Sequence, residues 1–219
     1  MVAQIENRAS VFSCDGSIVF SIGRTMPLTP GWNTTLIPAP KARHGTMAET
    51  LAYMEAWDAV VKDKRFSTSD WIVKVSPDTV FFANRLREKF RQHPVAKGSS
   101  PFFLNCEKGL LGEPTLLGSV EVFSRGALEA YRRGSSSCKE LPWTDWTENT
   151  YIQQCLVLLK VESIVDGDMV ADKRCQPARC SDISKVAYHG YGDASSYLQC
   201  WEKATEVAMA SNFMKSLAH

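Results

Sequence analysis

The 219-residue sequence lacks any apolar run close to the ~20 residues that a helix needs to cross a bilayer. It also lacks a surplus of charge, because 25 Lys and Arg residues stand against 24 Asp and Glu residues. Nucleic-acid binding by counterion release needs a basic stripe, which this balance does not supply. The first residues, MVAQIENRASVF, contain no basic segment followed by an apolar core. We therefore expect that any targeting peptide was removed or never present.

Internal repeats and low-complexity segments are absent as well. The hydrophobic fraction of 44% and the charged fraction of 22% are those of an ordinary globular chain, which excludes a disordered, collagen-like or coiled-coil protein. A chain of this length can bury roughly 70% of its unfolded surface in one domain. We expect one domain that spans residues 1–219.

The cysteines set this composition apart from that of a typical intracellular protein. Seven are present without a CxxC pair, and Cys175 and Cys180, the closest two, have no partner pair spaced to bind zinc. We expect up to three disulfides, one odd thiol and a lumenal or extracellular location. We nominate Cys106 with Cys138, which flank one strand–helix unit, although several cysteines could instead be buried apolar residues. The N-glycosylation sequon at residues 33–35 (NTT) suits the same setting.

Short β-branched and aromatic runs alternate with longer helical periodicities, which is typical of an α/β protein with a mostly parallel sheet. Thr46 and Glu49 have capping-box spacing and begin a helix that should end near Lys64. A buried strand at 71–75 must stop at Pro77, which removes a ladder donor. The other expected strands are 11–12, 17–22, 35–37, 102–105, 119–124, 162–166 and 185–188, and the other helices are 82–90, 127–133 (closed by Gly134), one around 152–159, and 195–214.

Three groups of polar residues lie at strand ends and helix starts, where an α/β sheet places its ligands. They are Ser76 with Asp78, Asp145 with Glu148, and His189. Each group also has a structural interpretation. Asp145 and Glu148 have capping-box spacing, Asp78 follows a proline as turn residues do, and His189 fits a hydrogen-bonded histidine at a strand edge.

Four segments carry a distinctive order of residues: 70–81 (DWIVKVSPDTVF), 118–128 (GSVEVFSRGAL), 148–156 (ENTYIQQCL) and 188–189 (YH). They resemble the W-x-x-K-x-D-x-D-T, G-x-x-x-V-hydrophobic-S-x-x-A-L, E-D-x-x-hydrophobic-x-x-C-L and aromatic-His segments of GT-A-fold nucleotide-sugar glycosyltransferases. This family includes the Fringe-like and mucin-type galactosyltransferases. A divergent branch from photosynthetic protists, with Asp-Pro-Asp at the strand end and several of these cysteines, is more similar still.

The resemblance implies a GT-A-like three-layer sandwich and a site for a UDP-sugar with Mn²⁺ or Mg²⁺. The diphosphate leaving group needs a divalent cation held by carboxylates and often by histidine. Asp78 and His189 would be those ligands, and Lys74 and Ser76 would lie at the donor.

The remaining catalytic role implied by the resemblance is the base. A carboxylate must take the proton from the acceptor hydroxyl, and Glu148 or Asp145 is the candidate. Trp143 and Trp146 would offer a stacking platform for a sugar, although tryptophans near a helix start also seal the edge of a core.

The chain departs from the family pattern in three places. Ser76 replaces the first Asp, and its hydroxyl cannot offset a divalent charge. Asn149 replaces the second carboxylate of the Glu-Asp pair, and an amide cannot accept a proton at physiological pH. About 75 residues precede the metal motif, so the resemblance predicts an N-terminally shortened fold without the strand and helix that enclose uracil and ribose.

We therefore expect a catalytically degenerate glycosyltransferase-like domain that needs no cofactor and serves as a binding or structural subunit. Its expected partners are the proteins of a larger assembly, such as one on the lumenal face of a membrane complex, in the secretory pathway or the plastid lumen. The alternative is an active, metal-dependent transferase that uses a UDP-sugar. A third interpretation is a glycan-binding module with Trp143 and Trp146 as its platform.

Overall fold

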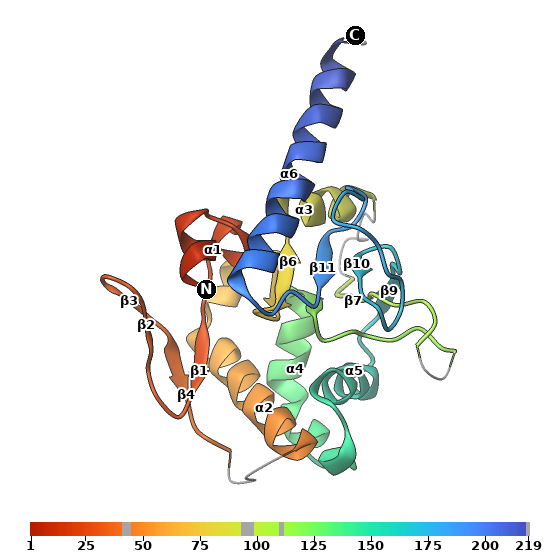
Figure 1. Ribbon diagram of the computed structural model, residues 1–219. Coiled ribbons are helices and arrows are strands. Elements are labelled where there is room, and N and C mark those ends of the chain that lie inside the picture. Colours follow the sequence, from red (N-terminus) through yellow and green to blue (C-terminus); the bar gives the residue numbers. More distant parts are fainter. Residues whose placement is uncertain (41–44, 93–98, 110–111, 218–219) are drawn as a thin grey trace.

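The computed structural model describes residues 1–40, 45–92, 99–109 and 112–217 (Figure 1). Its main sheet has four strands in the order β5 (Trp71–Val75), β8 (Val120–Ser124), β7 (Phe102–Leu104), β9 (Ser163–Val165). Strands β5, β7 and β9 run in one direction, and β8 runs in the opposite direction between β5 and β7. The α/β class is confirmed. Two of the three pairings are nevertheless antiparallel, because the single reversed strand is central.

Three helices cover one face of this sheet: α2 (Thr46–Asp63), α4 (Arg125–Cys138) and α5 (Glu148–Leu158). The ring of Trp57 in α2 meets Phe123 of β8 edge-on, with centroids 5.0 Å apart. Helical spacing explains why these segments bury one side each. The side chains that fill this layer are Leu128, Tyr131, Tyr151, Ile152 and Leu156.

The opposite face is covered by α3 (Ala83–Gln92) and by a second sheet, with the order β10 (Val170–Ala171), β11 (Ala187–His189), β6 (Thr79–Phe81). Trp71 of β5 stacks on Phe90 of α3, with ring centroids 4.3 Å apart. The long helix α6 (Ala194–Leu217) then packs on the second sheet through Tyr197, Cys200 and Ala204. The main sheet is thus the middle of three layers, as the expected sandwich requires.

The C-terminal half of α6 extends away from the rest of the molecule (Figure 1). Its apolar side chains Met209, Phe213 and Met214 are 67%, 63% and 66% exposed. No described helix is long and apolar enough to span a membrane.

The first forty residues contribute no strand to the main sheet. They form α1 (Val2–Glu6), a 3₁₀ helix (Ser10–Ser13), the parallel pair β1 (Phe20–Ile22) and β4 (Thr35–Ile37), and the hairpin β2 (Pro27–Thr29) and β3 (Trp32–Asn33). The strand expected at 11–12 is wrong. Its two apolar residues lie in the 3₁₀ turn, where Phe12 packs edge-on against Trp32 at 5.2 Å between centroids.

Three disulfides cross-link the chain: Cys106–Cys175, Cys138–Cys155 and Cys180–Cys200. The expected number and the single free thiol, Cys14, are confirmed. The nominated pair Cys106–Cys138 is wrong, because Cys138 at the end of α4 lies against α5 and Cys106 follows β7. Disulfides of this number indicate an oxidising compartment.

Helix α4 runs through Gly134 and does not end there as expected. A Cβ atom at this position would lie 2.2 Å from Cδ2 of Leu159, which follows α5. The glycine therefore permits a close approach between the end of α5 and α4, and it is not a helix terminator. The helices predicted from 46, 82 and 195 are confirmed within a few residues.

Candidate functional site

A buried charged cluster joins the main sheet to α2 and α5. The ammonium of Lys74 in β5 donates to Oε1 of Glu121 at 3.0 Å and to both carboxylate oxygens of Glu148 at 3.0 and 2.9 Å. It also lies 4.3 Å from the ring centroid of Tyr53 in α2. The side chains of Glu121 and Glu148 are 0% and 7% exposed. Glu148, the candidate base, is thus an ion-pair partner inside the protein.

The electrostatics of this cluster follow from one cation facing two buried carboxyls. Burial alone would lower the pKa of Lys74, but the charges of Glu121 and Glu148 outweigh it and raise that pKa. Burial, followed by the charge of Glu148, raises the pKa of Glu121 well above its usual value. Two buried carboxyls thus share one ammonium, and burial disfavours the charged form of Glu121.

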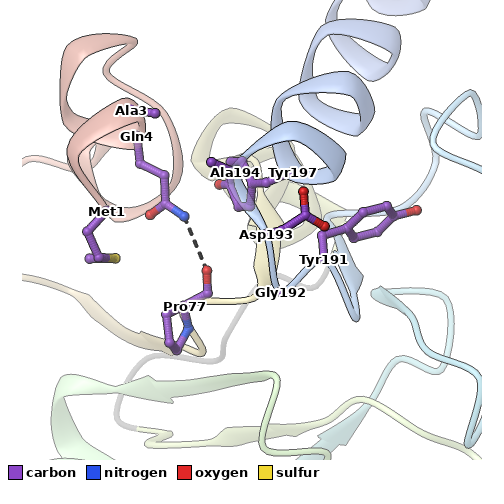
Figure 2. Close-up of a pocket in the computed structure, with 9 residues that line it drawn as sticks. All are labelled: Met1, Ala3, Gln4, Pro77, Tyr191, Gly192, Asp193, Ala194 and Tyr197. Carbon is purple, nitrogen blue, oxygen red and sulfur yellow. Dashed lines mark hydrogen bonds between the residues drawn. The ribbon is translucent and has the colours of Figure 1, made fainter.

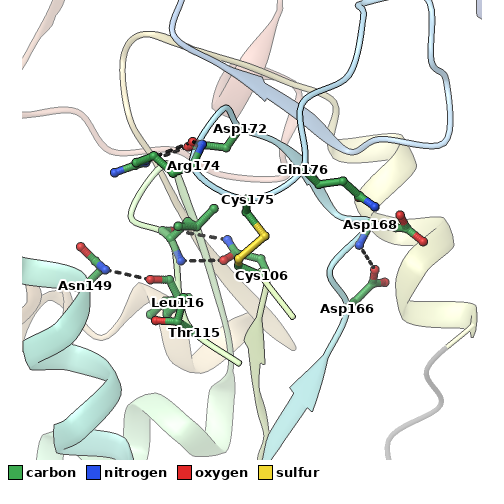
Figure 3. The surroundings of a disulfide bond; sticks show 12 residues. Cys106, Thr115, Leu116, Asn149, Asp166, Asp168, Asp172, Arg174, Cys175 and Gln176 are labelled. Carbon is green, nitrogen blue, oxygen red and sulfur yellow. Dashed lines mark hydrogen bonds and ion pairs between the residues drawn. A yellow bond between two sulfur atoms is a disulfide. The ribbon is translucent and has the colours of Figure 1, made fainter. Parts of the chain in front are cut away.

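Side chains from the motif positions converge on the backbone of residues 115–118, which we call the pinned segment. Lys74 Nζ and Ser76 Oγ both donate to the carbonyl of Gly118, at 2.8 and 3.1 Å. Asn149 Nδ2 donates to the carbonyl of Leu116 at 2.8 Å (Figure 3). Two of the three departures from the family pattern, Ser76 and Asn149, therefore have structural partners.

Two further side chains hold the same pinned segment. Oε1 of Gln153 in α5 accepts from the Leu116 backbone N–H at 2.9 Å. The amide of buried Asn105 accepts from the N–H of Leu117 and donates to its carbonyl, at 2.6 and 3.1 Å. A segment without regular secondary structure has to find such partners, because buried backbone groups are costly when left unpaired.

A second polar cluster is more accessible and lies where β6 and β11 pair. The antiparallel register opposes His189 to Thr79 and brings Nε2 of His189 to 3.2 Å from Oδ2 of Asp78. Nδ1 of the same ring lies 2.8 Å from Oδ2 of Asp172, which is 1% exposed. Arg174 donates to both oxygens of Asp172 (Figure 3). The predicted ligands Asp78 and His189 are therefore neighbours.

The charges around His189 favour its protonated form. The hydrogen bond to Asp172 is the largest cause that raises the pKa of His189, and the charge of Asp78 adds to it. Burial opposes ionisation of Asp172, yet hydrogen bonds from His189 and Arg174 lower its pKa far below the ordinary range. The resulting network is a chain of alternating charges: Asp78, His189, Asp172, Arg174.

This arrangement does not fit a divalent metal. The two ring nitrogens of His189 face carboxylates at 3.2 and 2.8 Å, so neither is free to coordinate a cation in this arrangement. Asp172 is committed to Arg174 and His189. Among the described residues no group of three or more His, Cys, Asp or Glu side chains has the arrangement of a metal site.

The pocket at the carboxyl end of β5 is small. It lies between α1 and the start of α6 and is lined by Pro77, Gln4, Tyr191 and Tyr197, among others (Figure 2). Gln4 Nε2 donates to the carbonyl of Pro77 at 3.2 Å, which places α1 beside this strand end. Its volume is about 90 Å³, whereas pockets for ligands of drug or cofactor size measure roughly 300–1,000 Å³.

A larger pocket, of about 330 Å³, lies at the other end of β5. Asp70, Ser99 and Arg125 are among its lining residues, and none of the predicted site residues is. The larger pocket is therefore remote from the strand end at which the sequence predicts a donor site.

The remaining predicted residues lie between α4 and α5. Asp145 is exposed on a short 3₁₀ helix (Trp143–Asp145). Trp143 packs partly buried against the helical layer, with its ring 6.4 Å from that of Tyr151, and its Nε1 donates to the carbonyl of Lys139. Trp146 is half-buried, and its carbonyl accepts from Thr50. Trp143 thus seals a core edge.

Two carboxylates of these clusters, Glu121 and Asp172, are absent from the sequence-based candidates. Glu121 had a visible signal: it is the lone charge in the strand sequence VEVFS, as Lys74 is in WIVKV. The register pairs these two positions directly. No sequence signal pointed to Asp172, because its contacts with His189 and Arg174 depend on the loop that Cys175 and Cys180 anchor.

Comparisons with solved structures give a likeness of fold, and comparisons with families and curated proteins give none. No protein-family model matches the chain, and no curated protein matches it. Among solved structures it is similar to a glycosyltransferase involved in the glycosylation of the major capsid of PBCV-1. The TM-score is 0.45 and the identity 14%, over 80% of this chain and 84% of that one. A likeness of this extent carries no information about activity.

Proposed function

We propose that this protein is a catalytically degenerate glycosyltransferase-like domain that acts as a binding or structural subunit of a larger assembly. The observation that carries the proposal is the buried ion pair between Lys74 and Glu148. A general base needs a free carboxylate within reach of the acceptor hydroxyl. Here the carboxylate of Glu148 is 7% exposed and both of its oxygens accept from Lys74.

The donor side supports the same conclusion. Ser76 and Asn149 use their polar groups on backbone carbonyls of the pinned segment. Asp78 and His189 are satisfied by each other and by Asp172. Residues that would hold a nucleotide, a metal and a proton in a transferase are here engaged in holding the fold.

The assembly part of the proposal rests on the projecting half of α6. Monomeric proteins rarely expose a run of large apolar side chains along an otherwise unpartnered helix. Met209, Phe213 and Met214 form such a run. Since the net charge is only +1, we expect apolar contact with a protein partner rather than electrostatic attraction. The three disulfides support the secretory pathway or the plastid lumen as the location.

Calorimetry with UDP and Mn²⁺ tests the degenerate part. We expect no metal-dependent binding by the wild-type protein, and no transferase activity in the Ser76→Asp/Asn149→Asp variant. Tight binding that requires Mn²⁺ and is abolished by Asp78→Ala would contradict the proposal. Activity gained by the double variant would show that a donor pocket is intact.

The native mass of the protein in extracts of its source tests the assembly part. We expect it to migrate well above 24.4 kDa. The Met209→Glu/Phe213→Glu variant should migrate as a monomer, whereas the control Glu206→Gln, on the same exposed half of α6, should not change the migration. A wild-type protein that migrates as a monomer would contradict this part alone.

One observation favours the alternative of an active transferase with a UDP-sugar and Mn²⁺ or Mg²⁺. The pairing of β11 with β6 places Asp78 and His189 at one point on the surface, as two metal ligands would be. The same calorimetry decides between the two functions.

A further inference from the structure

The hairpin of β2 and β3 carries a feature that the proposed function does not use. Asn33 is the last residue of β3 and opens the sequence Asn33-Thr34-Thr35, the one N-x-Ser/Thr sequence in the chain. The hairpin projects from the body of the molecule (Figure 1). We propose that Asn33 is an N-glycosylation site, where a secretory-pathway oligosaccharide is attached to the side-chain amide.

The first and third residues of this sequence are exposed to solvent, and the middle residue is buried. Asn33 and Thr35 are exposed, whereas Thr34 is 5% exposed. Successive side chains of an extended chain point to opposite faces, so positions 33 and 35 share the outward face. The Thr34 hydroxyl is used inside, where it contacts Ser21 Oγ at 2.5 Å and accepts from the Met26 N–H at 2.8 Å.

The amide of Asn33 is also free to react. Within the described part of the chain its side chain makes no hydrogen bond, and its register partner across the hairpin is Pro27, which is itself exposed. The turn before it contains Pro30 and Gly31, the latter with φ of 82°, and turns of this kind form tight surface loops. A glycan on Asn33 would extend into solvent without displacing a packed side chain.

The disulfides supply an independent argument for exposure to the glycosylation machinery. Cys106, Cys138, Cys155 and Cys200 are almost completely buried and all are paired. Disulfides form in the oxidising lumen of the endoplasmic reticulum, where asparagine glycosylation of N-x-Ser/Thr sequences also takes place.

The chemistry requires a co-substrate, a lipid-diphosphate-linked oligosaccharide. Nδ2 of Asn33 attacks C1 of the first sugar and forms the N-glycosidic bond. The bond from C1 to the phosphate oxygen breaks, the lipid diphosphate leaves with the electron pair, and Nδ2 loses one proton. The protein is the acceptor in this step, so the inference is independent of whether the domain itself transfers sugars.

Mass spectrometry of the protein purified from its natural source tests the inference. Trypsin releases Asn33 within one peptide, residues 25–41. We expect this peptide to carry a glycan, and peptide-N-glycosidase F in H₂¹⁸O to convert Asn33 to an ¹⁸O-labelled aspartate. An unmodified peptide from the native protein would overturn the proposal. That result is expected if the protein is delivered to a compartment without passing through the endoplasmic reticulum.

Matched variants secreted from a eukaryotic host separate the modification from folding. Thr35→Ala should abolish the mass increase and Thr35→Ser should retain it, because the sequence needs a hydroxyl two residues after Asn33. Both variants should fold, with a cooperative thermal transition and with their disulfides formed, since the Thr35 side chain is exposed. A glycan that persists in folded Thr35→Ala would also overturn the assignment to Asn33.

Discussion

Replacing Lys74 by Met tests the central claim that the motif residues hold the fold. Met has a similar length and keeps the apolar stem, but it removes the ammonium that donates to Gly118, Glu121 and Glu148. Glu148 would then be left buried without its counterion. Such a loss is expensive because a charge removed from water is no longer compensated.

The magnitude follows from the burial of the partners. Lys74 is 14% exposed at its side chain, and its two carboxyl partners are 0% and 7% exposed. Breaking a buried ion pair by removing one partner costs about 3–5 kcal/mol. In a domain of this size 1 kcal/mol shifts the melting temperature by about 2–4 °C, so we expect a loss on the order of 10 °C.

Urea unfolding of the oxidised protein, followed by tryptophan fluorescence, measures this cost. The matched control is Lys74→Met/Glu148→Gln, which removes the unpaired charge together with the cation. The double variant should recover a large part of the lost free energy of unfolding. A second control, Glu121→Gln, keeps the contact of Lys74 with Glu148 and should lose less free energy of unfolding than Lys74→Met.

Two results would refute the reasoning. Lys74→Met with wild-type stability would show that the pair contributes little to folding and that Glu148 is available for chemistry. A double variant as unstable as the single one would show that the lost free energy of unfolding comes from lost packing and not from an unpaired buried carboxylate. Hydrogen exchange in the pinned segment should rise in Lys74→Met, because Gly118 loses one of its two side-chain donors.

Three further predictions follow from the other contacts. The pKa of His189 is raised in the folded protein, so the stabilisation that its protonation provides is present below the unfolded pKa and is lost as pH rises through the folded pKa. Asp172→Asn should lower the pKa of His189, measured by NMR titration, and should flatten this pH dependence of stability. Replacing Cys138 and Cys155 by Ala removes the cross-link of a short loop and should cost about 3 kcal/mol in urea unfolding. Gly134→Ala should lose about 1–3 kcal/mol by overpacking against α5, although alanine is the better helix former, and thermal melting should show a loss rather than a gain.

The sequence predicts the main helices and strands of this fold because their signals are local. Helical spacing defines α2 and α3, and the apolar run of β5, interrupted only by Lys74, ends where Pro77 requires it. The cysteine count correctly predicts three disulfides and one free thiol, since number and compartment are composition properties. The pairing of the cysteines cannot be predicted from composition, because Cys138 and Cys155 meet through the packing of α4 on α5.

Features that depend on long-range packing could not be predicted in this way. Gly134 has the appearance of a helix terminator until Leu159 is known to lie against it. The reversal of β8 within the sheet leaves no mark in its own residues, which are buried on both faces. Two-residue strands such as β10 are too short for any periodicity to define them.

The candidate site shows how residues at motif positions can take structural roles. The spacing that brings Lys74, Ser76 and Glu148 to one place is set by strand and helix geometry, and it is the same whether those groups bind a nucleotide or a backbone carbonyl. Ser76 donates to Gly118, which an ionised aspartate could not do. Asn149 likewise donates to Leu116, where a carboxylate would face a carbonyl oxygen. Restoring the acidic residues would therefore cost hydrogen bonds that the present fold uses, and we expect those substitutions alone to give no transferase activity without a second donor for the pinned segment.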